Sequence, residues 1–142
     1  MKNAFETLVK WEHCVQLIMA RTRRFPKVLR PTLGRRLDEQ CIESLVILSE
    51  TRYLPKDQKQ SSYEAVDRIL ATIRVLIRLA RAQEALSKEQ YRHLCENVDE
   101  VGRMIAGMRR QPVASAKFSL GEMKTAFAME RSDQEGRWIE IE

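Results

Sequence analysis

This chain of 142 residues has few aromatic residues, no long apolar run and no segment at its start that resembles a secretion signal. No apolar run approaches the roughly 18 residues that a membrane-spanning helix needs. The first residues, MKNAFETLVKWEHC, include acids and follow a helical period, which is unlike a secretory signal. The sequence therefore predicts a cytoplasmic protein without a membrane partner.

Cysteine is also scarce, and its spacing excludes two common uses. The three cysteines, Cys14, Cys41 and Cys95, are an odd number, and no two of them are close in sequence. The chain has no CxxC pair and no Cys/His cluster, so neither a disulfide framework nor a zinc site is indicated. The ExxH pattern of di-metal carboxylate bundles is missing as well. We expect three buried thiols, no metal and no cofactor.

Histidine, the commonest general base, occurs twice, at His13 and His93. Some helical RNA-cleaving domains carry an arginine five or seven residues before a histidine. The positions five residues before these histidines are Leu8 and Lys88, and neither position seven residues before is an arginine. The chain also lacks a glycine-rich phosphate loop. A Cys–His nucleophile from His13 and its neighbour is disfavoured, since adjacent helical residues point about 100° apart. The sequence predicts a protein that is not an enzyme.

Positive charge is what the sequence does have, and it is unevenly distributed. Residues 1–110 hold 21 basic and 14 acidic residues, whereas residues 111–142 hold four basic and six acidic residues. The basic part is therefore the one that could meet a polyanion.

Apolar residues recur at helical spacing in four segments, so the sequence predicts four helices and no convincing strand. The polar stretch at 55–62 is interpreted as a loop. The second helix is predicted to begin at the N-cap Thr32, and the fourth at a capping box of Ser87 and Gln90. The expected helices cover residues 4–24, 32–53, 62–86 and 87 to the stop imposed by Pro112.

Helices of about 20–25 residues are roughly 30–38 Å long, and their connections here are short. Such matched lengths predict an all-α fold, an antiparallel up-down four-helix bundle over residues 1–110. Gly102 and Gly107 are costly inside a helix, and they predict that another helix approaches closely there. The remainder, 111–142, is predicted to be a loosely ordered C-terminal extension with a possible short helix at 119–129.

Basic residues gather in three groups that could contact phosphates, because arginine binds them in bidentate geometry. Segment 21–36 carries seven positive charges and no acid. The third helix carries a ridge of three arginines, and the fourth helix ends with an arginine pair at 109–110. Aromatic residues are not interleaved with these charges, so base stacking on single strands has little support. The alternative is that each group is only a solvated face. The candidates are Arg21, Arg23, Arg24, Lys27, Arg30, Arg35, Arg36, Arg74, Arg78, Arg81, Arg109 and Arg110.

Several stretches resemble one family when taken in order. They are Phe25-Pro26-Lys27, the third-helix stretch 73–80, Leu86-Ser87 with Gln90-Tyr91, and the stretch 99–108, DEVGRMIAGM. Together they resemble the accessory variability determinant (Avd) proteins of diversity-generating retroelements, members of a broader four-helix-bundle superfamily. The resemblance covers about residues 5–110, and its motifs are largely structural.

The resemblance implies a homopentameric barrel with a basic surface. It implies binding to a reverse transcriptase and to RNA or DNA without strong sequence preference, in support of mutagenic retrohoming, without catalysis by the chain itself. Arg74 and Arg78 fall inside a matched stretch. A pentamer would bury Val75 and Leu79, which lie off the core stripe, and Trp11, which is large for one bundle.

Two other interpretations stay open beside the accessory factor. One is a protein-interaction module of the same superfamily with no nucleic-acid role. The other, a helical RNA-cleaving enzyme, is disfavoured by the missing motif. The acidic tail could cover the basic surface, contact the polymerase or do neither.

Overall fold

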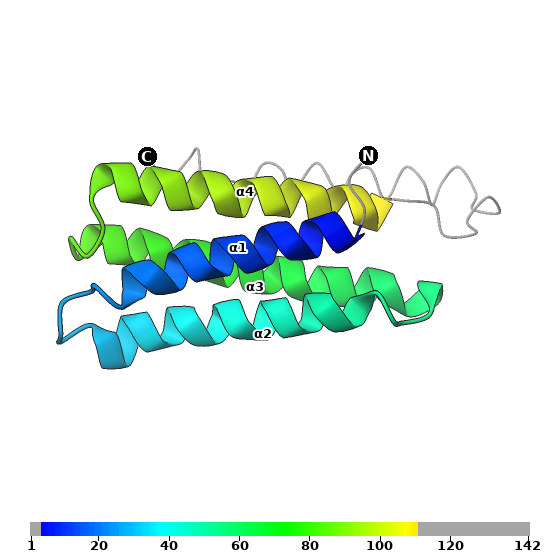
Figure 1. Ribbon diagram of the computed structural model, residues 1–142, viewed down its shortest axis with the longest axis horizontal. Helices are drawn as coiled ribbons and strands as arrows, with labels where there is room; N and C mark the ends of the chain where they lie inside the picture. The colour runs from blue at the N-terminus through cyan, green and yellow to red at the C-terminus, as the bar shows by residue number, and fades with distance from the viewer. Residues whose placement is uncertain (1–3, 111–142) are drawn as a thin grey trace.

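The computed structural model describes residues 4–110, and every regular element in that range is helical (Figure 1). Successive long helices run in opposite directions, and each packs against two others: α1 and α3 both contact α2 and α4. The predicted all-α, up-down four-helix bundle is therefore confirmed. The elements are α1 (Ala4–Thr22), the π-helix η1 (Arg30–Gly34), α2 (Arg35–Thr51), α3 (Lys56–Ala82) and α4 (Lys88–Arg110).

The core lies between the four helices, where each helix buries the apolar stripe that its sequence spacing predicted. In α4, for example, the buried stripe runs from Leu94 through Val98, Val101 and Ile105 to Met108. Trp11 on α1 is 0% exposed, and its indole Nε1 donates to Ser44 Oγ on α2 at 2.9 Å. The prediction that Trp11 is left over for a subunit contact is wrong, because one chain buries it completely.

The start of α3 differs from the prediction. Residues 56–61, interpreted from their polarity as a loop, form the first turns of the helix. Lysine and glutamine are good helix formers, so polarity alone did not indicate a break. Pro55 is extended (φ −60°, ψ 154°) and stands immediately before the helix, where its missing N–H costs nothing. The α2–α3 connection is therefore shorter than expected.

The start of α2 differs as well. Thr32 does not cap this helix; it lies inside η1, which continues directly into α2 through Gly34 in helical conformation. The Thr32 hydroxyl instead donates to the carbonyl oxygen of Leu29, at 3.4 Å. Pro31 is the second residue of η1. A proline is tolerated there because the first N–H groups of a helix have no acceptor within the helix.

The α3–α4 turn contains the predicted capping box. The backbone N–H of Ser87 donates to Gln90 Oε1 at 2.9 Å, and the Gln90 N–H donates to Ser87 Oγ at 3.1 Å. The third helix ends at Ala82, earlier than expected, and Glu84 takes a left-handed conformation (φ 62°) that favours glycine.

The two α4 glycines have different surroundings. A Cβ at Gly102 would lie 2.7 Å from Nη2 of Arg74, which reaches over from α3, so the predicted close approach is confirmed there. A Cβ at Gly107 would meet no atom of residues 4–110 within 4 Å, so the same prediction is wrong at that position.

Three further predictions concern the surface and the tail. Val75 and Leu79 are 51% and 46% exposed, as their position off the core stripe predicted. The possible helix at 119–129 lies outside the described residues, and the division into a 1–110 bundle and a 111–142 tail stays a prediction.

Among residues 4–110, no helix has the length and apolar character that crossing a membrane requires.

Candidate nucleic-acid interface

One end of the bundle collects most of the candidate residues. The antiparallel topology brings the end of α1, η1 and the start of α2 to the same end as the α3–α4 turn (Figure 1). We call this surface the basic end, defined by Arg21, Arg23, Arg24, Lys27, Arg30, Arg35, Arg36, Arg78, Arg81, Lys88 and Arg92.

The charge balance of the basic end differs from that of the rest of the bundle. Its eleven basic residues are accompanied by four acids: Asp38, Glu39, Glu84 and Glu89. The other residues of 1–110 carry ten basic and ten acidic side chains. All of the net positive charge of this part of the chain is therefore located at one end. Such a charge distribution creates a directed field that attracts polyanions.

The connection between α1 and α2, which carries many of these charges, is fixed by contacts of its buried residues. Phe25 is 1% exposed, and its carbonyl oxygen accepts a hydrogen bond from Arg30 Nε at 3.0 Å. Gly34 lies against Phe25, since a Cβ there would be 3.5 Å from the Phe25 ring. Thr22 Oγ1 donates to Asp38 Oδ1 at 2.7 Å and ties the end of α1 to α2. The exposed cations around Lys27 are thus presented by a packed connection.

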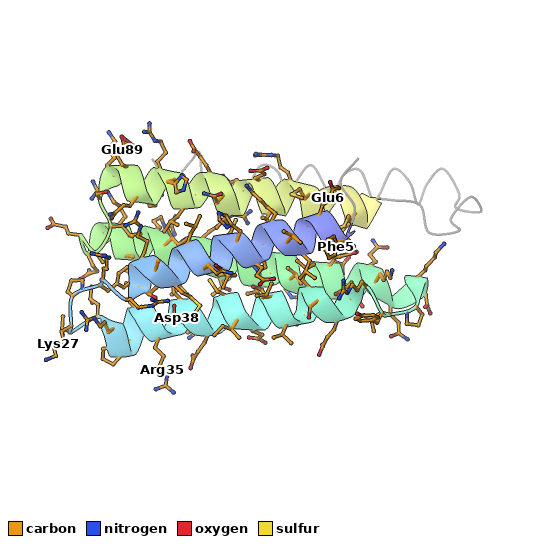
Figure 2. The ribbon with its side chains drawn as sticks, in the orientation of Figure 1. Phe5, Glu6, Lys27, Arg35, Asp38 and Glu89 are labelled. Atoms are coloured by element: carbon orange, nitrogen blue, oxygen red, sulfur yellow. The ribbon has the colours of Figure 1, made fainter. Side chains whose placement is uncertain are left out.

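Two of the four acids neutralise particular arginines. Arg35 Nε contacts Glu39 Oε2 at 3.1 Å, and Glu89 pairs with Arg92. Figure 2 shows Lys27 extending past the end of the bundle and Arg35 pointing away from α2. Both pairs are largely exposed, so they contribute little stability and can exchange for phosphate contacts. Seven exposed cations of the basic end make no ion pair with any other described residue: Arg23, Arg24, Lys27, Arg30, Arg36, Arg78 and Lys88.

The predicted ridge on α3 divides into three different environments. Arg74 Nε contacts Asp99 Oδ1 on α4 at 3.3 Å, and both side chains are less than one-fifth exposed. Arg81 Nη1 donates to the carbonyl oxygen of Leu86 at 3.1 Å and closes the α3–α4 turn. Arg78 is exposed. The sequence showed no acid beside this ridge because Asp99 comes from another helix.

The remaining two candidates lie at the opposite end of the bundle. Arg109 Nη1 contacts Asp67 Oδ2 at 3.0 Å and Nη2 lies 3.9 Å from Glu64 Oε2, with the side chain 12% exposed. Arg109 therefore joins α4 to α3. Arg110 is the last residue of α4, so it too is far from the basic end.

Sequence reasoning missed Lys88 and Arg92, which belong to the first turns of α4. The signal was available, since the capping box fixes where α4 starts and an antiparallel bundle places that start beside the 21–36 connection.

The cysteine and histidine candidates are dispersed. Burial raises the pKa of the Cys14 thiol to about 11, with smaller effects from Lys10, which lowers it, and Glu100, which raises it. Burial likewise raises the pKa of Cys41. Both thiols are therefore protonated at neutral pH, whereas a nucleophile needs the thiolate. His13 and His93 are exposed. Within the described range, no group of His, Cys, Asp and Glu is arranged to hold a metal ion.

The fold and the charge distribution together define a small four-helix-bundle protein with one strongly basic end. Comparison with protein families is more specific. The family model described as bAvd-like matches residues 7–112, so the chain belongs to the bAvd-like family. This agrees with the resemblance to Avd proteins of diversity-generating retroelements.

Family membership suggests an accessory role in a diversity-generating retroelement, since this is an accessory, non-catalytic kind of family. Comparisons with curated proteins and with solved structures gave no match.

Proposed function

We propose that this chain is a non-catalytic accessory factor of a diversity-generating retroelement. It binds the element's reverse transcriptase and nucleic acid, template RNA or cDNA, and so supports mutagenic retrohoming. The nucleic acid contacts the basic end. The observation that carries this proposal is the charge distribution: eleven basic residues accompany four acids at one end, while the rest of residues 1–110 is balanced.

The chemistry of the basic end favours contact with the phosphate backbone over reading of bases. Nine of its eleven cations are arginines, whose planar guanidinium groups bind phosphate oxygens in bidentate geometry. Residues 21–36 contain one aromatic residue, Phe25, and it is buried, so stacking on unpaired bases has no platform there. We therefore expect binding without strong sequence preference and with a steep dependence on salt.

The family resemblance further suggests that the accessory factor is a homopentamer. Exposed apolar side chains on several helices are available for contacts between copies, including Phe5 and Val9 on α1 and Ile42 and Val46 on α2. A closed ring would place five basic ends on one assembly. Five weak phosphate-binding ends acting together bind far more tightly than one.

The test is co-purification of the tagged chain with the reverse transcriptase encoded beside it, with the mass of the complex read by light scattering. The proposal predicts a complex that contains five copies of this chain and retains added RNA or cDNA at low salt. An oligomer that leaves the polymerase behind would contradict it.

A protein-interaction module without nucleic-acid binding is the second candidate, and the exposed apolar side chains favour it. The two are separated by a binding measurement at low salt with the free chain. Binding that disappears as salt is added supports the accessory factor, and no binding at low salt supports the interaction module.

A further inference from the structure

The outer side of α3 carries a second stripe of residues that faces away from the core. Five of its members, at 68, 71, 75, 79 and 82, are spaced three or four residues apart, as in a helix that packs against a partner on this side too, and Arg78 lies beside Leu79. All six are exposed, Val75 at 51% and Leu79 at 46%. We call this stripe the outer α3 face: Arg68, Ala71, Val75, Arg78, Leu79 and Ala82.

The outer α3 face combines apolar groups with positive charge and has no acid. No Asp or Glu occurs between residues 68 and 83. The other two arginines of this segment turn away from the face, Arg74 to Asp99 on α4 and Arg81 to the Leu86 carbonyl. The face therefore presents Val75 and Leu79 with Arg68 and Arg78 beside them. A complementary partner would be an acidic segment with exposed apolar residues.

The chain itself contains such a segment. Residues 130–142, ERSDQEGRWIEIE, hold five acids and two bases, and they end in Trp138-Ile139-Glu140-Ile141-Glu142, which combines three apolar residues with two glutamates. Apolar groups at 138, 139 and 141 match the apolar part of the face, and the glutamates match its arginines. Residues 4–110 supply the basic and apolar half of this match.

The described part of the chain ends beside the start of the outer α3 face. Arg109, one residue before the end of α4, contacts Asp67 on α3, and Asp67 immediately precedes Arg68. From Arg68 to Ala82 the face extends about 21 Å along the helix. The 27 residues between Arg110 and Trp138 have a root-mean-square span of about 29 Å if flexible. The segment can thus reach every part of the face.

We propose that residues 130–142 dock on the outer α3 face of their own chain, with Trp138, Ile139 and Ile141 against Val75 and Leu79. The glutamates of the segment lie beside Arg68 and Arg78. A two-fold contact between two copies of this face fits less well, because it would bring their arginines together without an acid. In the homopentamer proposed above, the contacts between copies then use the exposed apolar side chains of α1 and α2, and Val75 and Leu79 are covered by segment 130–142 instead.

Docking has a consequence for the basic end, since Arg78 belongs to both surfaces. A tethered acidic segment acts at an effective concentration in the millimolar range, so it competes with phosphate groups for Arg78. This consequence rests on the proposed nucleic-acid binding. The docking itself does not, and the following test reads docking alone.

The test uses the full chain and its two tryptophans. Trp11 is fully buried, so an added quencher such as acrylamide does not reach it, and any quenching reports on Trp138. Docking predicts that Trp138 is protected in the natural chain and becomes several-fold more accessible to acrylamide in Val75→Glu. The matched control is Val28→Glu, since Val28 is 77% exposed in the connection between α1 and η1, outside the outer α3 face and outside the apolar residues proposed for contacts between copies.

A second pair of variants leaves the bundle unchanged. Glu140→Lys is expected to expose Trp138, whereas Glu122→Lys, outside the docking segment, is expected to leave it protected. A Trp138 that is accessible in the natural chain, or protected equally in all four variants, overturns the proposal. Protection that is lost on dilution together with oligomer mass also overturns it, because the segment would then belong to a neighbouring copy.

Discussion

The hydrogen bond between Trp11 and Ser44 gives the sharpest stability prediction. Trp11 Nε1 donates to Ser44 Oγ at 2.9 Å, and the Ser44 hydroxyl donates onward to the Cys41 carbonyl oxygen, also at 2.9 Å. Trp11 and Ser44 are both 0% exposed. In Ser44→Ala the indole N–H stays buried without its acceptor, and an unsatisfied buried donor costs about 1–3 kcal/mol.

The matched control is Ser49→Ala. Ser49 is on the same helix, and its hydroxyl donates to the Val46 carbonyl oxygen at the surface. Both variants replace serine by alanine in α2, so the gain in helix propensity, up to about 0.5 kcal/mol, is the same in each. Urea unfolding of the full chain should find Ser44→Ala less stable than Ser49→Ala by about 1–3 kcal/mol. Equal free energies of unfolding would refute the placement of Trp11 in the core of a single chain.

Three other predictions follow from local geometry and can be checked by chemical unfolding. Gly107→Ala should stabilise the chain by up to about 1 kcal/mol, because alanine favours helix over glycine. Gly102→Ala should not show this gain, because its Cβ displaces the Arg74 guanidinium. Equal gains in the two variants would contradict the close approach of Arg74 to Gly102. Glu84→Gly should stabilise by about 0.5–1 kcal/mol by relieving the left-handed backbone, and a loss of stability would count against it. The pKa of Cys14 is raised from 9.0 to about 11, so the unfolded state ionises first and the free energy of unfolding falls as pH rises above about 9. Cys14→Ala should make this decrease of the free energy of unfolding with pH less steep, by up to about 1.4 kcal/mol per pH unit. An equally steep decrease in the variant would contradict the raised pKa of Cys14.

The bundle could be predicted from the sequence because each helix buries one apolar stripe with clear spacing. Helix boundaries were harder. Residues 56–61 are polar and helical at once, and Thr32 has the residue type of a cap but lies inside a π-helix. The first error arises because lysine and glutamine favour helix although they are polar. The second arises where the packing of Gly34 against Phe25 continues the helix through the position at which threonine would cap it.

The candidate surface was predicted in part. Segment 21–36 is basic in the sequence, and six of its seven cations are exposed in the structure, with Arg21 half-buried. The environments of Arg74 and Arg109 depend on acids 25 and 42 residues away in the sequence. No local pattern contains that information. Topology, by contrast, would have added Lys88 and Arg92.

The central claim, that the basic end binds nucleic acid through phosphates, is tested most directly by measuring affinity against salt concentration. The natural chain is compared with a variant in which Arg23, Arg24 and Lys27 are all glutamine. A control variant has Lys56, Lys59 and Arg103, which lie away from the basic end, changed to glutamine.

The account predicts that the affinity of the natural chain falls steeply with salt, by a slope of about −0.9 per phosphate contacted. The basic-end variant should bind more weakly with a slope smaller by about 2–3, and the control should behave like the natural chain. Equal losses in the two variants, or an affinity that does not change with salt, would contradict the account.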